Sequence, residues 1–267
     1  MGAIDTERAN VVTHELAGEE LLTVEALADA AARLDPSTVS HHLGNLPVVS
    51  PEGNARQLRL APADVVSGLA TNGCWVMMRS LASLPEYQAL LDRHGRSFEL
   101  ALRARGEEPI GHNLIAFVAA PGATVPVHYD RNHHLLAQVQ GTKTVGVGVF
   151  RDEQEQQRQL ERGMFAERLN ADAIPDERDE FALSAGDALV IPAYAFHWVT
   201  VGDDVSVALT FAVTTDATAR AVDVHTMNVQ LRRLGAKPSG PGNARNDAWK
   251  ARALARARQM RAVTRRD

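Results

Sequence analysis

The sequence predicts a mainly β fold with helical extensions around a double-stranded β-helix, or jelly-roll, core. Short runs rich in Val, Ile, Phe and Thr follow one another between residues 113 and 215, and Gly and Pro separate them. Closely spaced short strands of this kind are typical of antiparallel sandwiches and barrels. Apolar residues recur at helical spacing on both sides of this region. We therefore expect a mainly helical region at 1–110, the β core at 111–215 and C-terminal helices at 216–267.

Length and composition limit the classes of protein that this chain can represent. Its 267 residues (28.9 kDa) suffice for one large domain with extensions. No apolar run reaches 18 residues and the N-terminus is polar, so we expect neither a membrane span nor a signal peptide. The single cysteine, Cys74, excludes an internal disulfide framework and favours a reducing, cytoplasmic location. Aromatic residues make up only 5% of the chain and its net charge is −5, so nucleic acid is not the expected partner.

The first 110 residues are predicted to be mainly helical, with one or two strands. Thr23 stands before an apolar pattern of helical period, which Asp35-Pro36 ends. Gly and Pro interrupt residues 41–54, so His41 and His42 are expected in a loop, as a solvated pair rather than a metal site. The further elements are a helix that opens at Pro62, a strand that begins at Cys74 and a helix from Pro85 to Gly95.

The β core is predicted to contain eight strands. Each is a short run with high β-propensity, bounded by turn residues. In a jelly roll, an early strand and a late strand meet at one open end of the barrel. The predicted strands are 113–119, 124–129, 134–140, 143–150, 181–183, 188–192, 197–201 and 206–215.

A candidate metal site lies at the ends of two of these strands. His128 and Asp130 are two residues apart, and a strand directs residues i and i+2 to the same face. A third ligand is available in His197, which follows a strand-like run and a turn that contains Pro192. Two His and one carboxylate on one face of a metal form the ligand set of non-haem Fe(II) oxygenases. H-x-D alone is common by chance, but the surrounding strands favour a metal site.

Two stretches of the sequence resemble a known family. HYDRNHHLLAQVQGTK (128–143) and GDALVIPAYAFHWV (186–199) resemble the JmjC-type, cupin-like Fe(II)/2-oxoglutarate oxygenases of bacteria. The stretch 70–91 resembles the strand and helix that precede the core in such proteins, more weakly. The resemblance implies a cupin/JmjC-like jelly roll that uses Fe(II), 2-oxoglutarate and O2, with His128, Asp130 and His197 as metal ligands.

The resemblance also implies residues that bind the cosubstrate. Lys143 matches the lysine that holds the distal carboxylate of 2-oxoglutarate, and residues 198–219 offer no Lys or Arg as an alternative. The other reading of Lys143 is an exposed hairpin position. The remaining candidates for cosubstrate binding are Asn113, Thr124, His134 and Thr210. Val125 stands where a Thr or Ser is often found, a departure for which Thr124 or Tyr129 is expected to compensate.

Two charged segments lie outside the predicted site. Residues 151–180 hold ten Asp/Glu and five Arg, with Met164, Phe165 and Leu169 at helical spacing; a lid or substrate wall and a solvated surface helix are both open. Residues 244–267 carry net charge +6 and the rest of the chain −11. A basic helix suits nucleic acid or an anionic surface. We favour a terminal helix that packs Trp249, Leu254 and Met260 on the acidic body.

Three functions remain open at this point. The first is a 2-oxoglutarate-dependent dioxygenase that hydroxylates a peptide or protein side chain or a small molecule, with demethylation by the same chemistry possible. The second is a cupin-fold enzyme that uses another divalent metal, as an isomerase or a different dioxygenase. The third is a non-catalytic binding protein. The resemblance also implies a homodimer formed through the C-terminal helices.

Overall fold

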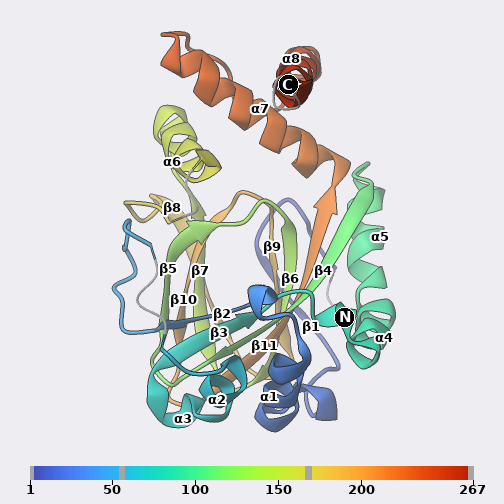
Figure 1. Cartoon of the computed structure of the whole chain (residues 1–267), viewed down its shortest axis with the longest axis vertical. Helices are drawn as coiled ribbons and strands as arrows, with labels where there is room; N and C mark the ends of the chain where they lie inside the picture. The colour runs from blue at the N-terminus through green and yellow to red at the C-terminus, as the bar shows by residue number, and fades with distance from the viewer. Residues whose placement is uncertain (1–2, 54–57, 166–169, 264–267) are drawn as a thin grey trace.

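The chain folds into two antiparallel sheets that face each other (Figure 1). The computed structural model describes residues 3–53, 58–165 and 170–263. The large sheet has the strand order β1-β9-β6-β11-β4-β3-β2, and the small sheet has the order β5-β10-β7-β8. Every pairing is antiparallel. The predicted mainly β jelly roll with helical extensions is confirmed.

The eight predicted strands are present, with ends that differ by a few residues. β8 begins four residues earlier than expected, because its first residues pair with the end of β7. The core strands are β4 (Pro109–Ala119), β5 (Thr124–Tyr129), β6 (His133–Gln140), β7 (Lys143–Val149), β8 (Glu177–Leu183), β9 (Asp187–Ile191), β10 (Phe196–Val201) and β11 (Ser206–Thr215).

Three N-terminal strands, β1 (Asn10–Thr13), β2 (Val39–Leu43) and β3 (Cys74–Met78), extend the large sheet. β1 pairs with β9, and β3 pairs with β4. The loop expected from residue 41 is wrong at its start, because His41 and His42 lie in β2 and pair with β3. The N-terminal region therefore completes the sheet of the β core as well as covering it.

Helices cover the outer face of the large sheet (Figure 1). Thr23 caps the first helix, its Oγ1 accepting a hydrogen bond from the Ala26 N–H (3.1 Å). Apolar side chains of the helices and of alternate strand positions form one buried cluster on this face, which includes Leu27, Phe98 and Phe211. The helices of this region are α1 (Val24–Arg33), α2 (Pro62–Ser67), α3 (Leu69–Asn72), α4 (Pro85–His94) and α5 (Arg96–Ala104), with 3-10 turns at Glu20–Leu22, Pro36–Thr38 and Leu81–Ser83.

The other strand positions face the space between the two sheets, which we call the barrel interior. Its apolar cluster contains Trp75, Val125, Val145, Leu189 and Val199, among others. The period of two along each strand separates this interior cluster from the helix-covered cluster.

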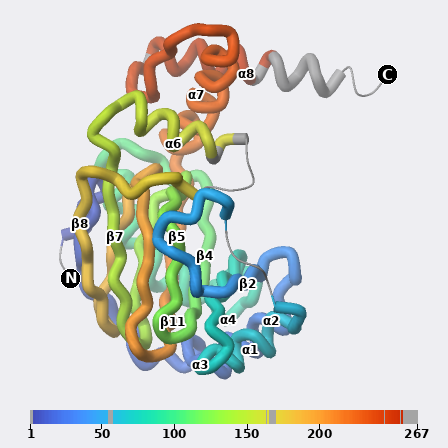
Figure 2. Tube along the Cα trace, turned by 90° about the vertical axis from the view of Figure 1, so that its left-hand side faces the viewer, coloured from blue at the N-terminus to red at the C-terminus, as the bar shows by residue number. Residues whose placement is uncertain are grey.

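Three further helices, α6 (Glu153–Phe165), α7 (Asp216–Arg233) and α8 (Ala244–Val263), lie at one end of the barrel (Figure 2). α7 follows β11 directly, through a capping box between Thr215 and Thr218. α8 packs on α7, with Leu254 buried and Trp249 47% exposed. The expectation that Trp249 packs on the acidic body is therefore wrong, because its side chain is exposed. Leu169 and the side chains of Phe165 and Met260 lie outside the described residues.

Among the described residues, no helical segment combines the length and the hydropathy that a membrane span requires.

Candidate metal centre of the barrel

His128, Asp130 and His197 converge at one end of the barrel interior. His128 in β5 is the cross-strand partner of His197 in β10, and Asp130 follows the end of β5. Asp130 Oδ2 lies 3.4 Å from His197 Nε2 and 3.9 Å from His128 Nε2. One possible ligand atom from each residue falls within 4.8 Å of the others, and no other such group of His, Cys, Asp and Glu occurs among the described residues. This set can hold one metal ion.

Backbone carbonyl groups orient both imidazoles. Nδ1 of His128 lies 2.8 Å from the Pro126 oxygen, and Nδ1 of His197 lies 3.1 Å from the Ala195 oxygen. A carbonyl oxygen can only accept, so each Nδ1 carries the proton and donates it. Each Nε2 then keeps its lone pair and faces Asp130. Hydrogen bonds of this kind to the distal ring nitrogen are a regular feature of metal-binding histidines.

A β-bulge brings His128 to the inside of the barrel. Between the pairs His128–His197 and Val125–Val199, β5 has one residue more than β10. Val125 belongs to the interior cluster and Val127 to a cluster on the outer face of the small sheet. Because of the extra residue, Val125 and His128 both face inward although they are three positions apart.

The electrostatics of the centre favour the forms that bind metal. Burial, together with the nearby His197, lowers the pKa of His128 to about 4. Burial opposes ionisation of Asp130, but the surrounding histidines, with His134 the strongest, hold its pKa well below the usual range. At neutral pH the site therefore presents a neutral His128 imidazole and an ionised Asp130 carboxylate, which are the forms that bind a metal.

Lys143 lies further inside, at the beginning of β7. It shares the inward face with Val145 and Val147, and it is 3% exposed. Its ammonium lies 5.2 Å from the centre of the Phe117 ring, and none of the described groups forms a hydrogen bond or ion pair with it. Burial lowers the pKa of Lys143 to about 7. Lys143 is thus a buried titratable group whose Nζ has no hydrogen-bond partner among the described residues.

Comparison with known proteins finds a similarity over the part of the chain that carries this site. A family model described as "JmjC domain" matches residues 107–221. This part of the chain is therefore similar to JmjC domains. It contains β4 to β11, and with them all three residues of the metal centre and Lys143.

Solved structures of YcfD from Escherichia coli share the fold. One matches with TM-score 0.51 and 14% identity, over 94% of this chain and 64% of that protein. A second, described as a ribosomal oxygenase, matches with TM-score 0.50 and 16% identity, over 93% of this chain and 62% of YcfD. A third, in complex with cobalt and 2-oxoglutarate, has TM-score 0.49, 16% identity and coverage of 93% and 62%. This chain spans less than two thirds of the length of YcfD. A search of curated proteins found no significant match.

The other expected cosubstrate residues occupy different parts of the matched region. Thr210 is buried on the inward face of β11. The Asn113 side chain accepts a hydrogen bond from the Ser80 N–H (2.8 Å). His134 Nδ1 lies 3.4 Å from Asp130 Oδ2, so this imidazole contacts a residue of the candidate metal site. Thr124 pairs with the exposed Thr200, on the outward face of the small sheet, away from the barrel interior.

The polar atoms of two tyrosines near the centre are already engaged. The Tyr129 hydroxyl donates to the Leu160 carbonyl oxygen of α6 (2.6 Å). Tyr194 lies in the turn before His197 and has φ +65°. Its N–H donates to the Asp130 carbonyl oxygen (2.7 Å). Its hydroxyl donates to the Thr218 carbonyl oxygen (3.0 Å). Sequence reasoning missed the role of Tyr194, since a left-handed tyrosine leaves no local signal.

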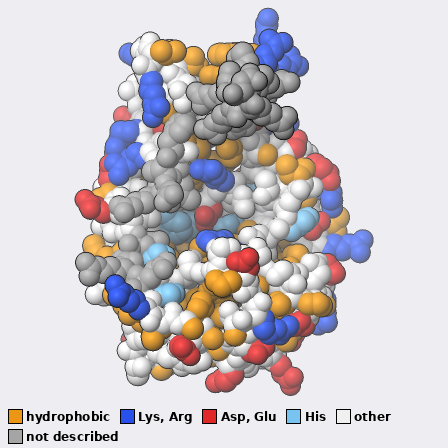
Figure 3. All heavy atoms as spheres, in the orientation of Figure 1, with side chains coloured by type: hydrophobic (Ala, Val, Ile, Leu, Met, Phe, Trp, Pro, Cys, Tyr) orange, Lys and Arg blue, Asp and Glu red, His pale blue; other side chains and the backbone are white. Residues whose placement is uncertain are grey.

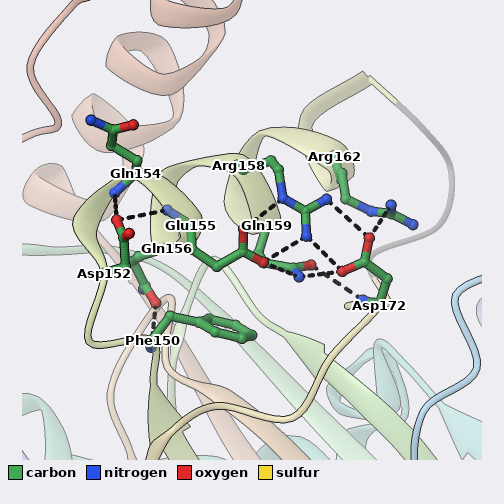
Figure 4. A network of polar contacts seen from close by, with 9 residues as sticks. All are labelled: Phe150, Asp152, Gln154, Glu155, Gln156, Arg158, Gln159, Arg162 and Asp172. Carbon is green, nitrogen blue, oxygen red and sulfur yellow. Dashed lines mark hydrogen bonds and ion pairs between the residues drawn. The ribbon is translucent and has the colours of Figure 1, made fainter.

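Residues 170–172 of the acidic segment lie beside β5, the strand that carries His128. Asn170 bridges to His128, and the Ala171 N–H donates to the Val127 carbonyl oxygen (2.8 Å). Asp172 accepts hydrogen bonds from Arg158 (2.7 Å), Arg162 and Gln159 of α6 (Figure 4). These contacts join residues 170–172 to α6 on one side and to β5 on the other. Figure 3 shows one face of the molecule, with His side chains (pale blue) gathered in its middle part next to an acidic side chain (red).

Proposed function

We propose that this protein is an Fe(II)- and 2-oxoglutarate-dependent dioxygenase that hydroxylates its substrate. The observation that carries the proposal is the unpartnered ammonium of Lys143, buried in the same barrel interior as the metal centre. A site that only bound a metal would have no need of a buried cation. A ligand with a second anionic group, held away from the metal, would pair with the Lys143 ammonium and so explain why a lysine is buried there.

His128, Asp130 and His197 would hold the iron. Three ligands on one face leave the remaining positions for a chelating cosubstrate and O2. When bound, iron supplies the oxidative decarboxylation of 2-oxoglutarate and the activation of O2. The protein contributes fixed tautomers on both imidazoles and an ionised Asp130, so the ligands need no rearrangement before metal binds.

Lys143 would hold the distal carboxylate of 2-oxoglutarate. A charge-assisted hydrogen bond between ammonium and carboxylate contributes about 1.5–3 kcal/mol. Thr210 and Asn113 are further proposed contacts of the cosubstrate, since both belong to strands that line the interior. His134 remains a proposed residue of the site through its contact with Asp130. Thr124 carries the weakest support, because its strand position faces outward.

For the substrate, we propose a protein or peptide side chain, with a small molecule as the alternative. The description of YcfD as a ribosomal oxygenase supports a protein substrate. Demethylation would use the same hydroxylation at an N-methyl carbon. We further propose a cytoplasmic homodimer. A buried free Cys74 suits a reducing compartment, and the exposed Trp249 on α8 suits a subunit contact through the C-terminal helices.

Formation of succinate tests the proposed activity. The purified protein, supplied with Fe(II), ascorbate, O2 and 2-oxoglutarate, is expected to form succinate faster when its substrate is present in a panel of peptides and metabolites. His197→Ala, assayed in parallel, should form none above background. If metal binds tightly but 2-oxoglutarate does not bind the metal-loaded protein, the oxygenase proposal is wrong and a cupin enzyme with different chemistry replaces it. Light scattering at tens of micromolar tests the homodimer; a monomer contradicts it.

A further inference from the structure

A second hydrogen-bond donor without an acceptor lies in the barrel interior. Trp75 in β3 is 3% exposed, and no described atom accepts a hydrogen bond from its indole Nε1–H. Its strand pairs Trp75 with Ala119 of β4, and both side chains belong to the interior cluster. The outer side of β3, by contrast, sends Cys74 and Val76 into the helix-covered cluster. The indole therefore faces the space between the sheets.

Trp75 and Lys143 pack against the same ring. The indole is stacked on Phe117 with a centroid distance of 5.5 Å, and the Lys143 ammonium lies 5.2 Å from the centre of that ring. The other side chains of this cluster are apolar, and the hydroxyl of Thr210, also buried on the inward face, forms no hydrogen bond with either donor. Two buried donors, one of them cationic, thus lie around one phenylalanine with nothing to receive their hydrogen bonds. Native structures rarely leave such donors unsatisfied.

The side chains expected to assist Lys143 are occupied elsewhere. Val125 cannot donate, Thr124 faces outward, and the Tyr129 hydroxyl is bonded to Leu160 of α6. A carboxylate has two oxygens that accept hydrogen bonds. Lys143 can serve one of them, which leaves the other in need of a donor.

We propose that the Trp75 Nε1–H donates to the distal carboxylate of 2-oxoglutarate, alongside Lys143. This inference rests on the proposed function. It assigns the indole to ligand binding, whereas a purely structural tryptophan at this position would only fill space against Phe117 and His42. The indole N–H is neutral, so it adds a directed hydrogen bond without adding to the buried charge.

Replacement of the indole N–H tests the proposal. Binding of 2-oxoglutarate and of oxalate to the Mn(II)-loaded protein is measured by calorimetry for wild type and Trp75→Phe. Oxalate chelates the same metal but has no distal carboxylate. We expect Trp75→Phe to weaken 2-oxoglutarate binding about tenfold, as for a lost hydrogen bond to a charged group, and to leave oxalate binding within twofold of wild type. Trp249→Phe, on the surface of α8, is the control and should change neither.

The outcomes separate this inference from the proposed function. Unchanged 2-oxoglutarate affinity in Trp75→Phe overturns the inference, and so does equal weakening of both ligands, which indicates a packing defect. Failure of the wild-type protein to bind 2-oxoglutarate overturns the proposed function itself.

Spectra of the wild type provide a measurement that does not depend on the folding of the variant. The chain has three tryptophans, so a 15N-labelled sample gives three indole N–H signals, which Trp→Phe variants assign. We expect the Trp75 signal to shift and its hydrogen exchange to slow when 2-oxoglutarate binds, but not when oxalate binds. A Trp75 signal that ignores 2-oxoglutarate contradicts the proposal.

Discussion

The two ends of the barrel interior differ in how their polar groups are satisfied. At the metal end, backbone carbonyl groups engage the Nδ1 atoms of His128 and His197, and three histidines surround the Asp130 carboxylate. At the Lys143 end, two buried donors have no acceptor among the described residues. Backbone groups of the chain therefore orient the residues of the metal end, whereas the two donors of the Lys143 end have no hydrogen-bond partner among the described residues.

The difference indicates that burial of Lys143 lowers the stability of the ligand-free fold. A buried, unpaired ammonium costs several kcal/mol relative to an apolar side chain of similar size, and function is the usual reason to retain one. The Asp130 carboxylate carries no comparable cost, because its neighbours favour the ionised form. Substitutions at the two ends are therefore expected to have different effects.

Loss of Asp130 should have the largest effect, and on metal binding. Asp130→Ala removes the one anionic ligand of the centre, so we expect Mn(II) or Co(II) to bind at least 100-fold more weakly by calorimetry. Asp179→Ala, which removes an exposed carboxylate of β8, should retain the wild-type affinity. Metal affinity that survives in Asp130→Ala would show that the three residues do not act as one site.

Lys143→Met should separate stability from ligand binding. Met keeps the length of the side chain without its charge, so the unfolding free energy of the ligand-free protein should rise by about 1–3 kcal/mol in urea at pH 7. Binding of 2-oxoglutarate to the metal-loaded protein should weaken tenfold or more. Metal affinity should stay within a factor of two. A variant that is destabilised and still binds 2-oxoglutarate normally would mean that Lys143 has a structural partner.

The pH dependence of the Lys143 end should be distinctive. Its pKa is about 7 in the folded protein and 10.5 when unperturbed, so the unfolded chain binds more protons between these values. Stability of the ligand-free protein should therefore rise with pH across this window, and this rise should be absent in Lys143→Met. Binding of 2-oxoglutarate should take up close to one proton at pH 8, because the carboxylate favours the charged lysine. Calorimetry in buffers of different ionisation enthalpy measures this uptake; zero uptake contradicts a neutral lysine in the free site.

The smallest effect is expected from Asp172, which lies in the acidic segment beside β5. Asp172→Asn weakens the contacts with Arg158 and Arg162, which are partly exposed, so the loss of stability should be about 1 kcal/mol or less. Affinities for metal and 2-oxoglutarate should not change, whereas the KM of the primary substrate should rise if the segment lines its path. A change in metal affinity would mean that α6 and Asp172 help to position the candidate metal ligands.

The sequence alone determined the features that depend on local pattern. Alternating apolar residues located eight strands within a few residues of their observed ends, because the period of two survives in any sheet. The ligand types at His128, Asp130 and His197 predicted one metal site, and the structure brings them together. Lys143 was singled out by resemblance and by the lack of any other cation in residues 198–219. Its role as a cosubstrate ligand stays a prediction.

Tertiary structure alone decided which side chains meet. The bulge in β5 turns His128 inward beside Val125, and strict alternation would have placed these two residues on opposite faces. β2 forms where the sequence suggested a loop, because β3 supplies its partner. The outward position of Thr124, the contact of His134 with Asp130 and the inward position of Trp75 arise in the same way. Each depends on register between strands far apart in the chain, and strand register is fixed by packing of the whole sheet rather than by neighbouring residues.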